Sequence, residues 1–220
     1  MFWSCEQGSY DRDLWHGGLG KTTLARAIYD KFSNYFEGSS FIANIREVSE
    51  KGDLILLQQQ LLEDILGEKK SKIWNVYHGV EMIKNRLRAK KVLLVLDDVN
   101  QLDQLEKLAR EDGWFGFGSW IIITTRNKHL LDQHGVHNIH KPDVLNREDA
   151  LKHFCLKAFK NENPKEGYKK LSQNIVHYAN GLPLALITLG SFLFGRTMEE
   201  WQSALVNLKK KSSQRNISYS

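Results

Sequence analysis

The sequence has few of the features that mark secreted, disulfide-rich or membrane proteins. Only two cysteines occur among 220 residues, Cys5 and Cys155, too few for a disulfide framework and more typical of reduced thiols in the cytosol or nucleus. The longest apolar run, residues 181–195, is too short to span a bilayer and contains Pro183. The polar residues 1–13 do not resemble a signal peptide. We therefore expect a soluble cytoplasmic protein, with the nucleus as the second candidate compartment and no membrane partner.

A strong excess of one charge is also missing. The net charge is +5, the basic residues are scattered, and only Lys209–Lys211 form a cluster. A nucleic-acid binder concentrates its positive charge on one face and interleaves it with aromatic residues. The sequence therefore does not favour nucleic acid as a partner. The composition, with 41% hydrophobic and 26% charged residues, is that of an ordinary globular chain able to bury a sizeable core.

The most informative stretch that is present covers residues 17–23, Gly-Gly-Leu-Gly-Lys-Thr-Thr. It matches the second half of the phosphate-binding pattern G-x-x-x-x-G-K-[ST], whose glycines let backbone N–H groups close around phosphate oxygens. In this pattern Lys21 reaches the β- and γ-phosphates and Thr22 offers its hydroxyl to Mg²⁺. A helix that follows directly would face the phosphates with its partial positive charge. The first glycine of the pattern is absent, because Trp15 stands in its place and His16 follows.

Apolar patterns predict alternating helices and strands as far as residue 144. Helices are expected after the loop and at 54–66, 80–87 and 102–108, and strands at 40–45, 92–96 and 119–124. This alternation predicts an α/β fold with a parallel sheet and helices on both faces. The strand that should lead into the loop is doubtful, because residues 11–13 (Asp-Arg-Asp) cannot occupy a central strand and Phe2-Trp3 lies far upstream. It is expected to be lost, replaced or very short, in a divergent and poorly ordered segment 1–14.

The second part of the chain carries helical patterns without strands. Asn146 is the expected N-cap of the first of four helices, with Asp149 three residues on. Pro183 falls in the first turn of the third, where its missing N–H is harmless. We predict a phosphate-loop domain over residues 15–144, a helical domain over 145–210 and a flexible tail over 211–220.

Charged side chains follow two of the predicted strands. The strand 92–96 ends at Asp97-Asp98 and the strand 119–124 ends at Thr125-Arg126. Because ligands of open α/β sheets bind at the carboxyl ends of the strands, these side chains are candidates for chemistry. Asp97 would hold Mg²⁺ through water, and Asp98 would orient or deprotonate an attacking water. Arg126 would pair with a γ-phosphate and report its presence.

Six stretches resemble, in order, the motifs of the nucleotide-binding (NB-ARC) domain of plant intracellular immune receptors. They are residues 17–23, 36–48, 91–100, 118–126, 145–159 and 181–186. Asn100, which closes the acidic strand motif, is typical of the class with a Toll/interleukin-receptor-like (TIR) domain and leucine-rich repeats. The resemblance implies a P-loop NTPase fold followed by a small helical ARC1-like domain. It also implies a STAND-type switch in which ADP holds the resting state and ATP permits assembly.

The resemblance further implies the site residues. Lys21, Asp98 and Arg126 would be catalytic, in at most a slow Mg²⁺-dependent ATPase, and Thr22 and Asp97 would hold Mg²⁺. Thr23 would lie near the α-phosphate and Pro183 beside the adenine. The implied nucleotide-binding residues are Gly17, Gly18, Leu19, Gly20, Lys21, Thr22, Thr23, Arg126 and Pro183.

The chain departs from the family at four positions. Trp15 and His16 replace a glycine and a small or apolar residue, Trp120 replaces a usual arginine, and Asn180 often has glycine as its counterpart. The match ends after the ARC1-like part, so the winged-helix, TIR and leucine-rich parts are expected to be missing. Two functions stay open. One is an ADP/ATP-binding switch module in the defence response, with slow or absent hydrolysis. The other is a nucleotide-incompetent fragment that acts as an interaction module or decoy for full-length receptors through self-association, because a lost central strand would expose a sheet edge.

Overall fold

The computed structural model describes residues 2–5, 20–67, 72–136 and 138–217. Its contacts divide the chain into two compact units, Met1–Pro142 and Asp143–Ser220. We name them the sheet unit and the helical unit and describe each by itself. The division falls two residues before the boundary expected from the sequence.

The sheet unit is built on five strands in the spatial order β2-β3-β4-β1-β5. Their bounds are β1 (Phe2–Cys5), β2 (Gly38–Ile42), β3 (Val92–Val99), β4 (Trp120–Thr125) and β5 (Asn138–His140). All neighbouring pairs are parallel. The central strands β3 and β4 are runs of Val, Leu and Ile that are buried along nearly their whole length, as expected of a parallel sheet covered on both faces. The predicted α/β fold with a parallel sheet is therefore confirmed.

The first strand is present and very short. β1 has four residues and pairs with β4, with Phe2 opposite Ile121, and with β5, with Trp3 opposite Asn138. Of the three outcomes left open by the sequence, the short strand is thus the one observed. The strand consists of Phe2–Cys5, far upstream of the charged residues 11–13 that made it doubtful. Residues 6–19 lie outside the described parts of the chain, so the expected poor order of 6–14 stays a prediction.

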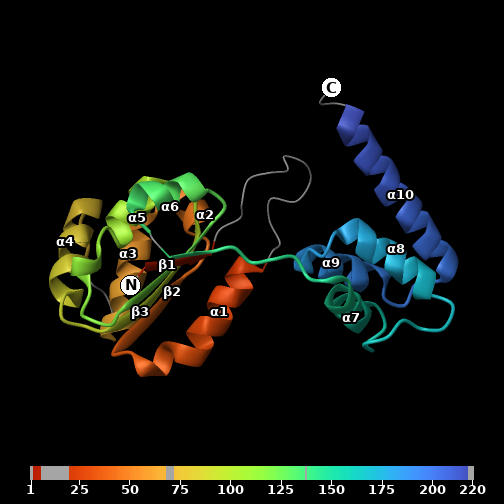
Figure 1. Ribbon diagram of the computed structural model, residues 1–220. Helices are drawn as coiled ribbons and strands as arrows, with labels where there is room; N and C mark the ends of the chain where they lie inside the picture. Colours follow the sequence, from red (N-terminus) through yellow and green to blue (C-terminus); the bar gives the residue numbers. More distant parts are fainter. Residues whose placement is uncertain (1, 6–19, 68–71, 137, 218–220) are drawn as a thin grey trace. The chain divides into compact units, whose positions relative to one another are not determined.

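Helices cover both faces of the sheet (Figure 1). The helix α1 (Lys21–Phe32) packs on one face through Ala25, against Leu93 and Val95 of β3. The alternate residues of β3, Val92, Leu94 and Leu96, enter the larger core on the other face. That core is covered by α2 (Ile45–Glu50), α3 (Leu54–Leu66), α4 (Val76–Leu87), α5 (Leu102–Leu108) and α6 (Lys128–His134). Two short 3₁₀ helices complete the unit, at Ser33–Tyr35 and Asp112–Trp114.

The helical unit contains α7 (Arg147–Ala158), α8 (Lys169–Ala179), α9 (Pro183–Leu193) and α10 (Met198–Ile217). As predicted, Asn146 caps α7, where its Oδ1 accepts the N–H of Asp149 at 2.9 Å, and Pro183 is the first residue of α9. Burial raises the pKa of the Cys155 thiol to about 11, so this thiol stays protonated at neutral pH. No helix within the described residues is long and apolar enough to cross a membrane.

The sequence predicted a flexible tail from residue 211, and helix continues through residues 211–217 of this segment. These residues form the last turns of α10, which ends at Ile217. The segment is polar, but it contains neither glycine nor proline. Nothing in it therefore stops a helix that has already started upstream.

Candidate functional site

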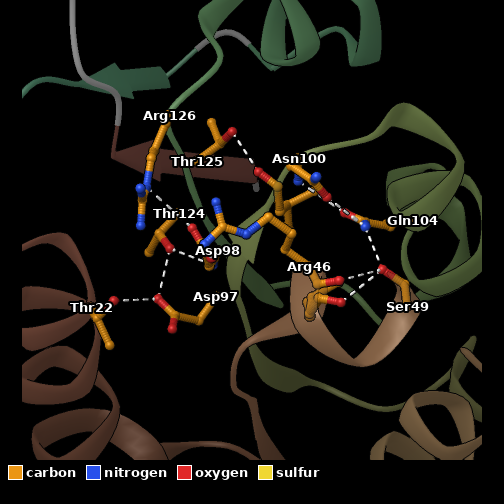
Figure 2. A network of polar contacts seen from close by, with 12 residues as sticks. Thr22, Arg46, Ser49, Asp97, Asp98, Asn100, Gln104, Thr124, Thr125 and Arg126 are labelled. Carbon is orange, nitrogen blue, oxygen red and sulfur yellow. Dashed lines mark hydrogen bonds and ion pairs between the residues drawn. The ribbon is translucent and has the colours of Figure 1, made fainter. Parts of the chain in front are cut away.

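The predicted polar residues meet at the carboxyl edge of the sheet (Figure 2). Asp97 and Asp98 lie at the end of β3, and Thr124 and Thr125 at the end of β4, because both strands run in the same direction. Thr22, in the first turn of α1, reaches the same place. The structure thus brings together residues that are 75 positions apart in the sequence.

The end of the glycine-rich loop has the backbone that its sequence requires. Gly20 has φ of 79°, in the left-handed region that favours glycine, and it is the N-cap of α1. Its carbonyl accepts the N–H of Leu24 at 2.8 Å, which starts the helix. The first turn of α1 carries no acidic residue, so no carboxylate of that turn opposes the positive end of the helix dipole. Residues 15–19, which include Gly17, Gly18 and Leu19, lie outside the described residues, and their predicted roles stay predictions.

Lys21, the first residue of α1, is buried, with only 9% of its surface exposed. An ammonium group is rarely buried unless it is paired. Thr23, two residues further along, is exposed in the first turn of α1. The loop therefore presents a lysine and two threonines at a helix N-terminus, which is the chemistry that binds phosphate.

Asp97 is the buried acid of the site. Only 2% of its surface is exposed, and its Oδ1 accepts hydrogen bonds from the hydroxyls of Thr22 and Thr124, both at 2.7 Å. These bonds offset the cost of burying the carboxylate. The Thr22 hydroxyl uses its proton on Asp97, so its oxygen lone pairs remain available to a cation.

A hard cation suits this donor set. Mg²⁺ prefers oxygen ligands and is commonly held by one or two protein groups together with substrate phosphates. Thr22 and Asp97 supply such oxygens at 2.7 Å from each other, next to the positive end of α1. No group of three or more His, Cys, Asp or Glu side chains that could hold a metal ion occurs in the described part of the chain. The oxygens of Thr22 and Asp97, too few to form a complete metal site alone, fit Mg²⁺ that is bound together with phosphate oxygens.

Asp98 has an unusual backbone and two cationic partners. Its φ is 58°, and the pairing of β3 with β4 becomes irregular between Leu96 and Val99. Its N–H donates to the Thr124 hydroxyl at 2.9 Å. Figure 2 shows its carboxylate between two arginines: Arg46 Nη2 lies 3.0 Å from Oδ2 and Arg126 Nε lies 3.5 Å from Oδ1. Left-handed backbone at a non-glycine residue costs roughly 1 kcal/mol or more and is concentrated at functional sites.

Arg126 directly follows β4, and hydrogen bonds of its neighbour Thr125 fix the backbone there. The Thr125 hydroxyl donates to the Val99 carbonyl at 2.7 Å and accepts the N–H of Asn127 at 3.0 Å. These bonds hold the backbone on both sides of Arg126, while 46% of its side chain remains exposed. The backbone of Arg126 is therefore held in place, while its guanidinium is exposed enough to move.

Two residues of this site are missing from the sequence-based prediction. Thr124 is the last residue of the predicted strand 119–124. The available signal was that this strand and the one before Asp97 end at the same edge of a parallel sheet. Arg46 lies on α2, a helix of six residues that apolar periodicity does not reveal. Pro183 lies in the helical unit, partly buried at the start of α9. Its place beside an adenine stays a prediction.

Family models and known proteins similar in sequence to this chain point to the same kind of site. The family model of the NB-ARC domain matches residues 15–164. Disease resistance protein RUN1 of Vitis rotundifolia is 47% identical over 196 residues, which is 89% of this chain and 15% of that protein. TMV resistance protein N of Nicotiana glutinosa is 43% identical over 203 residues (89% and 17%), and disease resistance protein RML1B of Arabidopsis thaliana is 41% identical over 197 residues (87% and 19%).

The chain thus spans less than a fifth of the length of each of these relatives. The matched region contains Thr22, Asp97, Asp98 and Arg126, the residues that meet at the sheet edge. Because the family model covers most of the chain and the geometry places its polar residues in one cluster, the chain belongs to the NB-ARC family of nucleotide-binding domains, in the form found in plant disease resistance proteins.

Proposed function

We propose that the chain binds ADP and ATP together with Mg²⁺ and acts as the switch module of a plant immune receptor, with slow hydrolysis or none. The observation that carries the proposal is the cluster at the carboxyl edge of the sheet. There Thr22 and Asp97 share a hydrogen bond of 2.7 Å, and Asp98 pairs with Arg126 one residue further along β3. The receptor context and a place in the cytoplasm, with the nucleus as the second compartment, are part of the proposal.

Each residue has a role that follows from its position. Lys21 and the N–H groups at the start of α1 would bind the β-phosphate and, in ATP, the γ-phosphate. Thr22 and Asp97 would hold Mg²⁺, which supplies positive charge against the phosphate oxygens. Arg126, with its exposed guanidinium, would contact a γ-phosphate when one is present.

Slow hydrolysis is supported by the state of Asp98. A general base must accept a proton from water, and it does so best when its carboxylate is available. Here both carboxylate oxygens of Asp98 already lie close to guanidinium groups, at 3.0 and 3.5 Å. Because both oxygens already face guanidinium groups, they are less accessible to an attacking water, which suits a switch that stays in one nucleotide state for a long time.

The alternative function, a nucleotide-incompetent decoy, was based on a lost central strand with an exposed sheet edge, on Trp15 in place of the first loop glycine, and on the truncation of the chain relative to full-length receptors. The structure bears on the first of these. β1 pairs with both β4 and β5, so the middle of the sheet is complete. The described structure therefore favours the switch module. Association with full-length receptors through self-association remains open as a second property of the same module.

The proposal is tested by calorimetric titration with ADP in the presence of Mg²⁺. We expect a saturable, one-to-one binding heat for the wild-type chain and at least a tenfold weaker affinity for Lys21→Ala, since the variant lacks the cation that reaches the β-phosphate. Lys31→Ala is the matched control, because Lys31 lies in the last turn of the same helix and is exposed. Equal binding heats for the wild type and Lys21→Ala would disprove the proposal.

A further inference from the structure

The Asp98 carboxylate has more cationic partners than its charge requires. It carries one negative charge, and two guanidinium groups face it, one from α2 and one from the end of β4. Arg126 closes the family motif 118–126 that predicted this site, whereas Arg46 lies in another of the family's motifs, residues 36–48. Arg46 has no assigned role, and its contact with Asp98 needs an explanation.

The two arginines hold Asp98 differently. Arg46 Nη2 lies 3.0 Å from Oδ2, which is a hydrogen-bonding distance, whereas Arg126 Nε lies 3.5 Å from Oδ1, beyond the usual range for such a bond. The Arg46 side chain is 38% exposed and the Arg126 side chain 46%. Arg46 is thus the closer and slightly better shielded partner, and Arg126 is the one more easily released.

A polar network fixes the helix that carries Arg46 (Figure 2). Ser49, one turn after Arg46 on α2, accepts a hydrogen bond from Gln104 Nε2. Gln104 is buried at the start of α5, and its Oε1 accepts the N–H groups of Asn100, at 2.9 Å, and Gln101, at 3.2 Å. Gln104 Nε2 also donates to Asn100 Oδ1 at 2.8 Å. This network ties α2 to the segment that follows β3, the strand that carries Asp98.

We propose that Arg46 is a positioning residue that keeps the Asp98 carboxylate neutralised, so that Arg126 can leave it for a γ-phosphate. The proposal rests on the proposed nucleotide switch and adds a second arginine to it. If Arg126 were the only counter-ion, its departure would leave a carboxylate that is 78% buried without a charged partner, since only 22% of the Asp98 side chain is exposed. With Arg46 in place, Asp98 keeps one close partner in both states.

The consequence is a selective effect on ATP. A γ-phosphate must draw Arg126 away from Asp98, and this costs more when Arg46 is absent. ADP has no γ-phosphate, so its binding leaves the pair of Asp98 and Arg126 intact. Removal of Arg46 should therefore weaken the binding of an ATP analogue and leave that of ADP unchanged, because a ligand shifts a two-state equilibrium only through its different affinities for the two states.

The test is a double-mutant cycle in binding. The dissociation constants of ADP and of the slowly hydrolysed analogue ATPγS, both with Mg²⁺, are measured for the wild type, Arg46→Ala, Arg126→Ala and the double variant. We expect Arg46→Ala to raise the ATPγS constant by about three- to tenfold, the scale of one partly exposed ion pair, and to leave the ADP constant unchanged. In the Arg126→Ala background, Arg46→Ala should have no further selective effect. Arg88→Ala, on an exposed residue after α4, is the control for the loss of an arginine.

Two further measurements test the role of the Arg46 charge and the presence of its contact with Asp98. Arg46→Gln keeps most of the side-chain length without the charge and should reproduce the ATPγS-selective loss, even if Arg46→Ala unfolds the chain. In the nucleotide-free protein, the melting temperatures of Arg46→Ala, Asp98→Asn and the double variant should be non-additive, because the contact exists without nucleotide.

The outcomes separate this inference from the proposed function. If the wild type binds neither ADP nor ATPγS, the proposed function fails and the role of Arg46 fails with it. If the wild type binds both nucleotides but Arg46→Ala weakens them equally, only the role of Arg46 is overturned. The same holds if the selective effect persists in the Arg126→Ala background, since Arg46 would then act without Arg126.

Discussion

At the scale of single residues, the direction of one hydrogen bond decides how a cation can bind. The Thr22 hydroxyl donates its proton to Asp97 Oδ1 at 2.7 Å, which leaves the oxygen free to face Mg²⁺. Thr124 donates to the same carboxylate oxygen from the other side at 2.7 Å. The carboxylate is therefore held in place before any ligand arrives, and a cation would find two fixed oxygens.

This geometry predicts the behaviour of Thr22 variants. Thr22→Val keeps the shape of the side chain but removes the hydroxyl, so we expect added Mg²⁺ to strengthen ADP binding in the wild type and to have little effect in the variant. Thr22→Ser keeps the hydroxyl and should stay within about threefold of the wild type. The measurement is the dissociation constant of ADP with Mg²⁺ and with EDTA.

The control for the loss of a threonine hydroxyl is Thr188→Val, at an exposed position of α9 in the helical unit. It should bind like the wild type under both conditions. An equal response to Mg²⁺ in the wild type and Thr22→Val would contradict the assignment of Thr22 as a metal ligand.

Some residues of the site could be located from the sequence and others could not. Thr22, Asp97 and Arg126 could be predicted because each follows a loop or strand whose pattern is visible in the chain. Arg46 could not, because its position depends on Asn44, whose left-handed backbone (φ 53°) ends the β2 segment and starts α2. The sequence does not show which asparagine adopts that conformation, so it does not show where the next arginine lies.

At the scale of elements, β2 and α3 depend on a glycine for their close contact. A Cβ added at Gly38, the first residue of β2, would lie 2.6 Å from the carbonyl oxygen of Ile65 and 2.7 Å from its Cγ2 atom. Both groups belong to α3, which supplies several buried residues of the core. Backbone cannot move aside as a flexible side chain can, so the packing itself would have to change.

We therefore expect Gly38→Ala to destabilise the chain by about 1–3 kcal/mol, the usual cost of overpacking. Urea unfolding monitored by circular dichroism would show a lower midpoint with little change of slope. Gly113→Ala is the matched control, because a Cβ there would meet nothing within 4 Å. A Gly38 variant as stable as the Gly113 variant would contradict the close packing of β2 on α3.

Most elements that could be predicted from the sequence are long enough to show a period; the seven-residue α5, predicted at 102–108, is an exception. The helix at 54–66 has the predicted bounds as α3, since it buries five leucine and isoleucine residues on one side. The helices α2 and α6 have six and seven residues, fewer than two full turns, and the three residues of β5 are mostly exposed. Such short elements are fixed by their neighbours in the sheet unit, and no local pattern identifies them.

At the scale of the whole molecule, the helical unit has a core of its own. Trp201 is 1% exposed, and its ring lies 5.6 Å from that of Phe154, 5.2 Å from Phe159 and 5.0 Å from Tyr168. Its indole N–H donates to the Leu193 carbonyl at 3.0 Å. Trp201 of α10 thus contacts residues of α7 and α9 and both ends of the segment between α7 and α8, all within residues 143–220.

A core of this kind predicts that the fragment 143–220 folds without the sheet unit. We expect a helical circular dichroism spectrum and cooperative thermal unfolding for the isolated fragment. Trp201→Ala should remove a large part of this stability and lower the melting temperature steeply, because truncation of a buried aromatic residue costs about 3–5 kcal/mol and a domain of this size has a stability of roughly 4–12 kcal/mol. Leu156→Ala, at a position of α7 that is 43% exposed, should melt like the unaltered fragment. A fragment without a cooperative transition would show that the helical unit needs the sheet unit to fold, whatever the packing around Trp201.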